Sequence, residues 1–298
     1  MRGGPVPDRM ELVGPTTQAF VTFLVVPEDR ALLEVVDSLR RRSAEGGADR
    51  RAEWLRSLND LISGARIYHV RATAIVEALP GGESEVGFVV SLGKMANLVR
   101  MLLGIADSER EVQTYRKERI ILGREKHDLA VSFVGNNLIL SRDPQTIRVL
   151  IDRLKRAAGT AEPSERLQAM MRDLETKQDL PGYAALINEK TSLASIWRMV
   201  TGAPEGSEIA LPGSFEGAGF RFGLASADSL RGDGFFYFED EEAAAGALPQ
   251  LETALRRVFA HFRLKSKVGV EQEGSRLRVS VEAQGIQRAL DHYFDRVR

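Results

Sequence analysis

The chain has 298 residues, of which 43% are hydrophobic and 28% charged, a composition that lets a globular protein bury a sizeable core and excludes a disordered chain. Its 41 basic residues are matched by 42 acidic ones, and a net charge of −1 leaves no basic footprint for nucleic acid. Cysteine is absent, which excludes disulfides, thiolate metal sites and cysteine nucleophiles.

Short apolar strands repeatedly lead through a polar or acidic cap into a helix with one narrow apolar stripe. Three such units precede residue 157. Asp143 and Pro144 give the third a sound helix start, as N-cap and first helical residue. The strands span 20–26, 86–92 and 138–141, and the stripes are Leu32, Val35, Val36 and Leu39, then Met95, Leu98, Val99 and Leu102, then Ile147, Leu150, Ile151 and Leu154.

Three more units follow a loop at 157–163 that contains glycine and proline. Their strands include 183–187, 235–238 and 277–281. Their stripes begin at Leu193, at Leu248 (with Leu251, Leu255, Val258, Phe259 and Phe262) and at Ile286. Two further helices carry Trp54, Leu58, Leu61 and Ile62, and Leu167, Met170, Met171 and Leu174. Three units on each side predict an internal duplication, with an N-terminal half at 1–158 and a C-terminal half at 159–298.

Alternating stretches that meet across short turns predict three hairpins, which join 68–76 to 86–90, 129–133 to 138–140 and 268–270 to 277–281. Turns this short make the strands antiparallel, because a parallel connection needs a dozen or more residues. The predicted fold class is α+β, with antiparallel sheets, helices packed on one face and two similar halves.

Three passages resemble a bacterial family, domain-of-unknown-function family thirty-three fifty-two: Phe-Val-Val-Ser-Leu-Gly-Lys-Met at 88–95, Val-Gly-Asn-Asn-Leu-Ile-Leu-Ser-Arg-Asp at 134–143 and Asp-Ser-Leu-Arg-Gly-Asp-Gly-Phe at 228–235. The resemblance covers most of the chain through patterns. It implies an anchored or exported protein of the bacterial envelope and supplies no catalytic residues. A periplasmic or other extracytoplasmic location is therefore expected from the resemblance. A cytoplasmic one stays open, because the first residues show no signal segment.

No catalytic residue, metal site or cofactor is predicted. The motifs of zincins, P-loop enzymes and α/β-hydrolases are missing. The four histidines, His69, His127, His261 and His292, lack the spacing of metal ligands. The acidic run Glu239–Glu242 could seat a cation through its oxygens. Helix capping is the favoured interpretation, because negative side chains are stabilised at a helix N-terminus.

The predicted binding residues are His69 and Arg71 on one strand and Arg276 and Arg278 on another, with Thr73 and Ser280 on the same polar faces. If helices cover only one side of the sheet, these side chains offer cationic donors to an anionic partner. A merely solvated face is the favoured interpretation, because antiparallel sheets commonly leave one side in water.

Three functions remain open, and catalysis is the weakest. The leading hypothesis is a non-catalytic binding or assembly module of the envelope, with a protein or an envelope component as partner, no nucleic acid and no transmembrane segment. The second is a carrier of an apolar or anionic ligand in a cleft between the halves. The third is a hydrolase whose site is assembled from distant residues.

Overall fold

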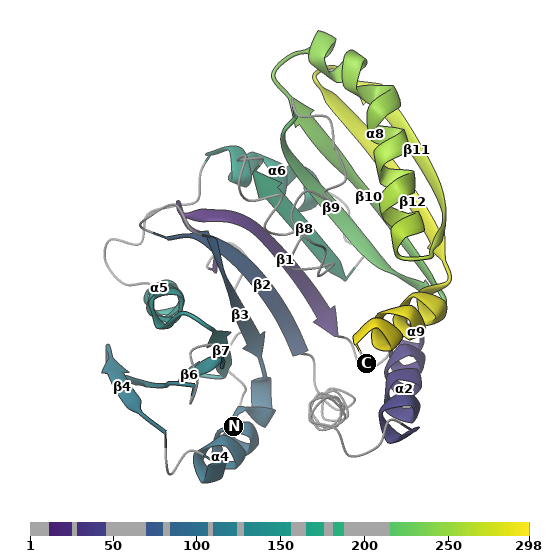
Figure 1. Cartoon of the computed structure of the whole chain (residues 1–298). Coiled ribbons are helices and arrows are strands. Elements are labelled where there is room, and N and C mark those ends of the chain that lie inside the picture. Colours follow the sequence, from purple (N-terminus) through teal and green to yellow (C-terminus); the bar gives the residue numbers. More distant parts are fainter. Residues whose placement is uncertain are drawn as a thin grey trace. The chain divides into compact units, whose positions relative to one another are not determined.

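The computed structural model describes residues 12–25, 29–45, 70–79, 84–106, 110–123, 128–155, 165–175, 181–187 and 215–297 (Figure 1). Some predicted features lie outside them: the helix that carries Trp54, the stripe that begins at Leu193, and His69 and His127. The described residues form a mixed helix and strand fold built on antiparallel sheet, in agreement with the predicted class.

The chain divides into two compact units, and each is assembled from separate stretches of sequence. The first takes its described residues from within 12–24, 70–172 and 184–187, and the second from within 25–45, 173–183 and 215–297. The division into halves 1–158 and 159–298 follows the sequence repeat and stays a prediction.

In the first unit the strand order is β1-β2-β3-β7-β6-β5-β4, and the pairs from β2 onward are antiparallel. The strands are β1 (Thr17–Val25), β2 (Val70–Ala78), β3 (Ser84–Ser91), β4 (Val112–Tyr115), β5 (Glu118–Ile121), β6 (Ala130–Val134) and β7 (Asn137–Ser141). The β2–β3 and β6–β7 hairpins confirm two of the predictions. A further hairpin, β4–β5, was not predicted.

The helices of the first unit are α4 (Ala96–Ala106), which follows a 3-10 turn (Gly93–Met95), and α5 (Pro144–Leu154). Asp143 caps α5 by accepting a hydrogen bond from the backbone N–H of Thr146 at 2.8 Å, as its position before Pro144 predicts. Leu98, placed in the predicted stripe of α4, is 51% exposed, so that part of the prediction is wrong.

The core of the first unit forms where α5 packs on β3, β6 and β7. Ile147, Leu150 and Ile151 are fully buried, which confirms the third predicted stripe. Gly87 of β3 allows this close approach, since a Cβ there would lie 2.6 Å from Cδ1 of Leu150. The same core contains three side chains from beyond residue 158, Leu167, Met171 and Ala185.

In the second unit the strand order is β11-β12-β10-β9, again antiparallel. The strands are β9 (Phe215–Ser226), β10 (Ser229–Phe238), β11 (Lys265–Glu273) and β12 (Arg276–Gln284), and the helices are α2 (Arg30–Glu45), α8 (Glu241–His261) and α9 (Ile286–Val297). The β11–β12 hairpin confirms the third prediction. Two elements, α6 (Glu165–Glu175) and β8 (Gly182–Ile187), contribute residues to both units.

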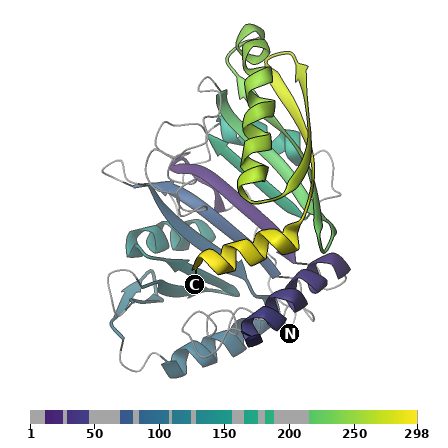
Figure 2. The ribbon, with the colours of Figure 1, turned by 45° about the vertical axis from the view of Figure 1, so that its right-hand side comes forward.

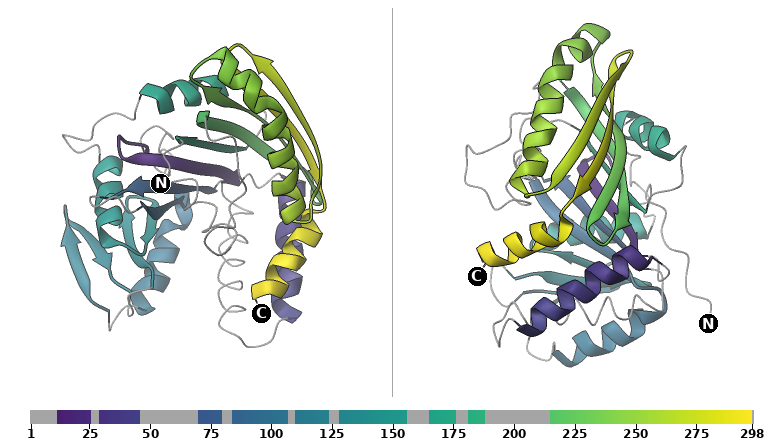
Figure 3. Two further views of the ribbon diagram at one scale, coloured as in Figure 1. Left: turned by 45° about the horizontal axis from the view of Figure 1, so that its top comes forward. Right: turned by 90° about the vertical axis from the view of Figure 1, so that its right-hand side faces the viewer.

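Helix α8 covers one face of the β10–β12–β11 sheet (Figure 2). Its buried side chains are Ala244, Ala247, Leu251 and Ala254, so small residues bring the helix close to the strands. Leu255, predicted as core, is half-buried. Helices α2 and α9 lie side by side (Figure 3), and the hydroxyl of Ser38 donates to Oε1 of Gln287 at 2.5 Å.

Candidate functional site

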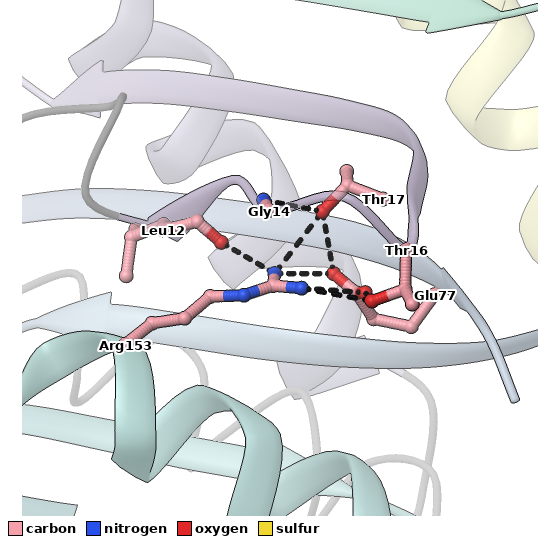
Figure 4. Close-up of polar contacts among 6 residues, drawn as sticks. All are labelled: Leu12, Gly14, Thr16, Thr17, Glu77 and Arg153. Atoms are coloured by element: carbon pink, nitrogen blue, oxygen red, sulfur yellow. Dashed lines mark hydrogen bonds and ion pairs between the residues drawn. The ribbon is translucent and has the colours of Figure 1, made fainter. Parts of the chain in front are cut away.

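An ion pair between Arg153 and Glu77 is buried in the first unit (Figure 4). Arg153 comes from α5 and Glu77 from β2, and their side chains are only 6% and 1% exposed. The pair is bidentate: Nη1 donates to Oε1 of Glu77 at 2.6 Å, and Nη2 donates to Oε2 at 2.8 Å. Two parallel bonds between guanidinium and carboxylate are the strongest arrangement that these groups adopt.

The first residue of β1 and residues just before it complete this cluster. Arg153 also donates to the carbonyl of Leu12 at 2.8 Å and to the hydroxyls of Thr16 and Thr17 at 3.1 and 3.0 Å. Both hydroxyls donate to the Glu77 carboxylate at 2.8 Å. Each carboxylate oxygen therefore accepts two hydrogen bonds, which fills its acceptor positions.

These contacts make the cluster a structural clamp. A general base must reach the proton that it abstracts. The carboxylate of Glu77 does not meet this requirement, because four hydrogen-bond donors occupy its acceptor positions. The clamp fastens the start of β1 to β2 and α5. Gly14 leaves space for the guanidinium, since a Cβ there would lie 2.6 Å from Nε of Arg153.

Of the polar face predicted for the first of these strands, the structure describes Arg71 and Thr73, both in β2. Arg71 is half-buried and has an interaction partner. Thr73 is 3% exposed, and its hydroxyl lies 2.9 Å from the hydroxyl of Thr22 in a buried hydrogen bond. The expectation that Thr73 faces solvent is wrong, because this face of β2 runs on into Ile75 and Glu77, which are also buried.

Arg276 and Arg278 of β12, by contrast, lie on the side of their sheet away from α8. The alternate residues Leu277, Val279 and Val281 are buried, and strand alternation places the two arginines on the opposite face. We call this surface the polar sheet face. It consists of Arg231, Asp233, Phe235 and Tyr237 of β10, Lys265, Lys267, Gly269, Glu271 and Glu273 of β11, and Arg276, Arg278, Ser280 and Glu282 of β12.

Arg276 is held in place by two carboxylates and one aromatic ring. Its guanidinium lies 3.2 Å from Oδ2 of Asp173 and 3.1 Å from Oε2 of Glu273, and 4.5 Å from the ring centroid of Phe235. Tyr237 donates its phenol proton to the same Asp173 oxygen at 2.9 Å. Burial, and then this hydrogen bond, raise the pKa of Tyr237 above its ordinary value.

The charges on the polar sheet face are matched across neighbouring strands. Arg278 stands opposite Glu271 of β11 and Phe235 of β10. Glu282 stands between Lys267 of β11 and Arg231 of β10. Opposite charges in cross-strand pairs stabilise a sheet. This pairing gives the face a mixed pattern of charges, with the rings of Phe235 and Tyr237 next to Arg278 and Arg276.

Within the described ranges, no three His, Asp or Glu side chains come together in a way that could hold a metal ion. Among the helices of that same part of the chain, none is both long and apolar enough to cross a membrane. The acidic run Glu239–Glu242 leads into α8, where Asp240 accepts a hydrogen bond from the N–H of Ala243 at 2.7 Å and so caps the helix.

No family model matches the chain, and no curated protein does. Among solved structures the chain is similar to crystal form IV of TP0453, with a TM-score of 0.51 and 10% sequence identity. The match covers 95% of this chain and 95% of that one. At this identity the likeness shows a shared fold alone.

Neither the clamp nor the matched charges were predicted, although each leaves a trace in the sequence. Arg153 lies within the α5 stripe, three residues after Leu150, and Glu77 follows Ile75 on the same face of β2. A charged residue at a core position needs a partner. This rule predicts that Arg153 and Glu77 each have a partner of opposite charge, but it does not identify the partner.

Proposed function

We propose that the protein is a non-catalytic binding module that holds a partner protein against the polar sheet face. The observation that carries the proposal is the arrangement around Arg278. Its side chain is 39% exposed, and its ion-pair contact with Glu273 is 3.7 Å long, beyond hydrogen-bonding distance. The guanidinium therefore keeps donors for a carboxylate of the partner.

The neighbours of Arg278 favour a protein partner. Arg276 is already fixed over the ring of Phe235, so the aromatic contact is ordered before a partner arrives. Arginine and aromatic side chains dominate the energetics of protein interfaces, and preorganised side chains lose less entropy on binding. Because acidic side chains alternate with the basic ones on this face, an extended polyanion would gain little from it.

An array of acidic peptides tests this proposal. We expect peptides that carry a carboxylate next to an aromatic or aliphatic residue to bind the wild-type chain and to lose at least tenfold in affinity with Arg278→Ala, since a hydrogen bond to a charged group contributes about 1.5–3 kcal/mol. Arg257→Ala is the matched control, because Arg257 is exposed on α8, on the other face of the sheet. Peptides that bind the wild type and both variants equally would refute the assignment to this face.

We further propose an extracytoplasmic location and membership of the family thirty-three fifty-two. The support is the family resemblance of residues 88–95 and 134–143, which coincide with the end of β3 and its 3-10 turn and with the β7 segment up to the cap of α5. Fractionation of the source cells with an antibody to this chain is the test. Recovery with cytoplasmic proteins alone would contradict the location.

We also propose that the two halves arose by duplication, and their strand orders support this. The first half has the order β1-β2-β3-β7-β6, followed by β5 and β4, and the second has β8-β9-β10-β12-β11. In chain order both run strand, hairpin, helix, hairpin, helix, with β4–β5 as an addition in the first half. An experimental structure in which these two five-strand sets fail to superpose would contradict the proposal. The carrier and hydrolase alternatives stay predictions.

A further inference from the structure

Strand β11 is the last strand of its sheet in the described part of the chain. Its counterpart in the first half, β6, is covered on the same side by β5 of the additional hairpin. In the second half only Phe262–Leu264 separate α8 from β11, so no hairpin is inserted there. A nine-residue edge with unpaired backbone groups is a template for another strand.

The outward backbone groups of β11 follow from its turn. The two-residue turn at Gly274 and Ser275 makes Glu273 and Arg276 a hydrogen-bonded pair. Along an antiparallel strand, residues alternately direct their backbone N–H and C=O groups toward and away from the neighbouring strand. Counting from Glu273, the backbone groups of Val268 and Val270 point away from β12. In agreement, the carbonyl of Val268 takes a long contact of 3.5 Å from the exposed side chain of Arg256.

The side chains of β11 are complementary to those of a second β11. The strand reads Lys-Ser-Lys-Val-Gly-Val-Glu-Gln-Glu, with lysines at one end and glutamates at the other. If two copies run antiparallel about Gly269, Lys265 faces Glu273 and Lys267 faces Glu271, and each pair occurs twice. Within the described residues, Lys265, Lys267 and Glu271 make no ion pair with their own chain, and all three are exposed.

We propose that the protein forms a twofold-symmetric dimer in which β11 pairs antiparallel with β11 of a second copy. Such an interface is isologous, so one self-complementary strand is sufficient to build it. Val268 of one copy exchanges backbone hydrogen bonds with Val270 of the other, and the two ion pairs fix the register. The backbone pairing of this dimer uses the outer edge of β11, whereas the proposed partner contact uses Arg278 of β12, so separate variants test the two proposals.

The twofold axis passes through Gly269, where the absence of a side chain matters. With Val268 and Val270 hydrogen-bonded, the two Gly269 residues form the closer, non-hydrogen-bonded type of pair, with Cα atoms about 4.5 Å apart. Lys267 and Glu271 fall in the same class of pair, which brings their side chains close together. A residue larger than glycine at position 269 would meet its own copy across the axis.

The first test is the oligomeric state of the full chain, measured by sedimentation velocity over a range of protein concentrations. We expect a monomer–dimer equilibrium for the wild type. Lys267→Glu and Glu271→Lys each place like charges opposite one another twice, and each variant should weaken the dimer at least tenfold. Lys117→Glu is the matched control, since it makes the same charge change on the exposed β4–β5 turn.

The deciding test combines the two variants. The double variant Lys267→Glu, Glu271→Lys exchanges both charges and should recover the dimer. An equimolar mixture of the two single variants should form a heterodimer, although neither associates alone. In the mixed pair the introduced glutamate of one copy faces the introduced lysine of the other, and the native Glu271 of the first copy faces the native Lys267 of the second. Native mass spectrometry separates the heterodimer from the homodimers when one variant is isotope-labelled.

A wild type that stays monomeric at every concentration would overturn the proposal. So would a dimer that persists unchanged in both single variants, because its interface would then lie elsewhere. Circular dichroism of each variant checks that the fold is retained. A folded double variant that fails to dimerise would show that the ion pairs do not set the register.

Discussion

Among single residues, Arg153 and Glu77 stand out because both charges are buried and all their partners are local to one clamp. Removing two ions from water is costly, and their attraction offsets that cost only while the geometry is complete. The clamp therefore contributes to stability chiefly as a unit. Removing one member leaves the other charge buried without its counterion.

Glu77→Gln should lower the free energy of unfolding by about 3–5 kcal/mol, because Arg153 then keeps a buried charge that no carboxylate balances. The double variant Glu77→Leu, Arg153→Met should recover most of that loss. Urea denaturation of both proteins is the measurement. Glu118→Gln is the control: it breaks the more exposed pair with Lys155 and should cost about 1 kcal/mol or less. Equal losses for Glu77→Gln and Glu118→Gln would show that the clamp is not buried as described.

Tyr237 should make stability depend on pH in the alkaline range. Its pKa is raised in the folded protein, so its contribution is fully present below the ordinary value near 10.0 and is lost as the pH rises through the folded pKa. Tyr237→Phe should flatten this alkaline decline. The free energy of unfolding against pH checks it, and an unchanged slope would contradict the assignment. In the ultraviolet titration of the folded chain, this variant should also lose a phenol whose pKa is raised above the ordinary value near 10.0.

Among the elements, α5 and α8 differ in how they meet their sheets, and their leucines should differ in consequence. Leu150→Ala should cost about 2–5 kcal/mol, because the side chain is fully buried and leaves a cavity. Leu255→Ala should cost about 1–2 kcal/mol, because α8 makes its closest contact through alanines and Leu255 is half-buried. Denaturant midpoints give both values, and equal costs would show that α8 packs through its leucines after all.

The cap of α8 gives an element-scale test of the acidic run. Asp240→Ala should cost about 1 kcal/mol, the usual contribution of an N-cap. EDTA should leave the melting temperature unchanged, because the acidic run is assigned to helix capping. A structural ion would add its binding free energy to folding, so its removal would lower the melting temperature. A large drop in melting temperature on chelation, restored by calcium or zinc, would reassign Glu239–Glu242 to a metal site.

The sequence predicts those elements whose signals are local. Asp143 before Pro144 marks the start of α5, and glycine-containing turns mark the hairpins that end at β7 and β12. The β4–β5 hairpin escaped prediction because its turn uses Arg116 and Lys117, which adopt φ angles of 46° and 69° without the glycine or asparagine that signals such a turn. In α8 the predicted Leu251 is fully buried, but the buried alanines were missed because alanine carries little hydrophobic signal.

The candidate site was predicted only where strand alternation decides it. Alternation places Arg276 and Arg278 on the face opposite Leu277, which α8 does not cover; Asp173 of α6 contacts Arg276 on that face. The same argument fails for Thr73, because β2 is a central strand with Ile75 and Glu77 buried beside it. Alternation separates the two faces of a strand, but only tertiary packing determines which of them meets solvent.

At the scale of the whole molecule, the two halves of the sequence contribute to each other's compact units. Leu167, Met171 and Ala185 lie in the core of the first unit, although all three come after residue 158. In the second unit, α2 contacts β9, and Ser38 of α2 bonds Gln287 of α9. On the proposed duplication the two copies are interleaved, so repeat boundaries in the sequence need not be folding boundaries.

Fragments 1–158 and 159–298 should therefore fail to fold separately and should fold when they are mixed. The first fragment lacks three core side chains of its unit, and the second lacks α2, so each would leave apolar surface in water that its own chain cannot cover. Thermal melts followed by circular dichroism should show a cooperative transition only for the mixture, which should elute as a one-to-one complex. A longer fragment, 1–196, is the control for the first unit, because it restores Leu167, Met171 and Ala185 and should regain part of the transition. If fragment 1–158 melts cooperatively by itself, the repeat boundary is also a folding boundary, and the side chains from beyond residue 158 are dispensable to its core.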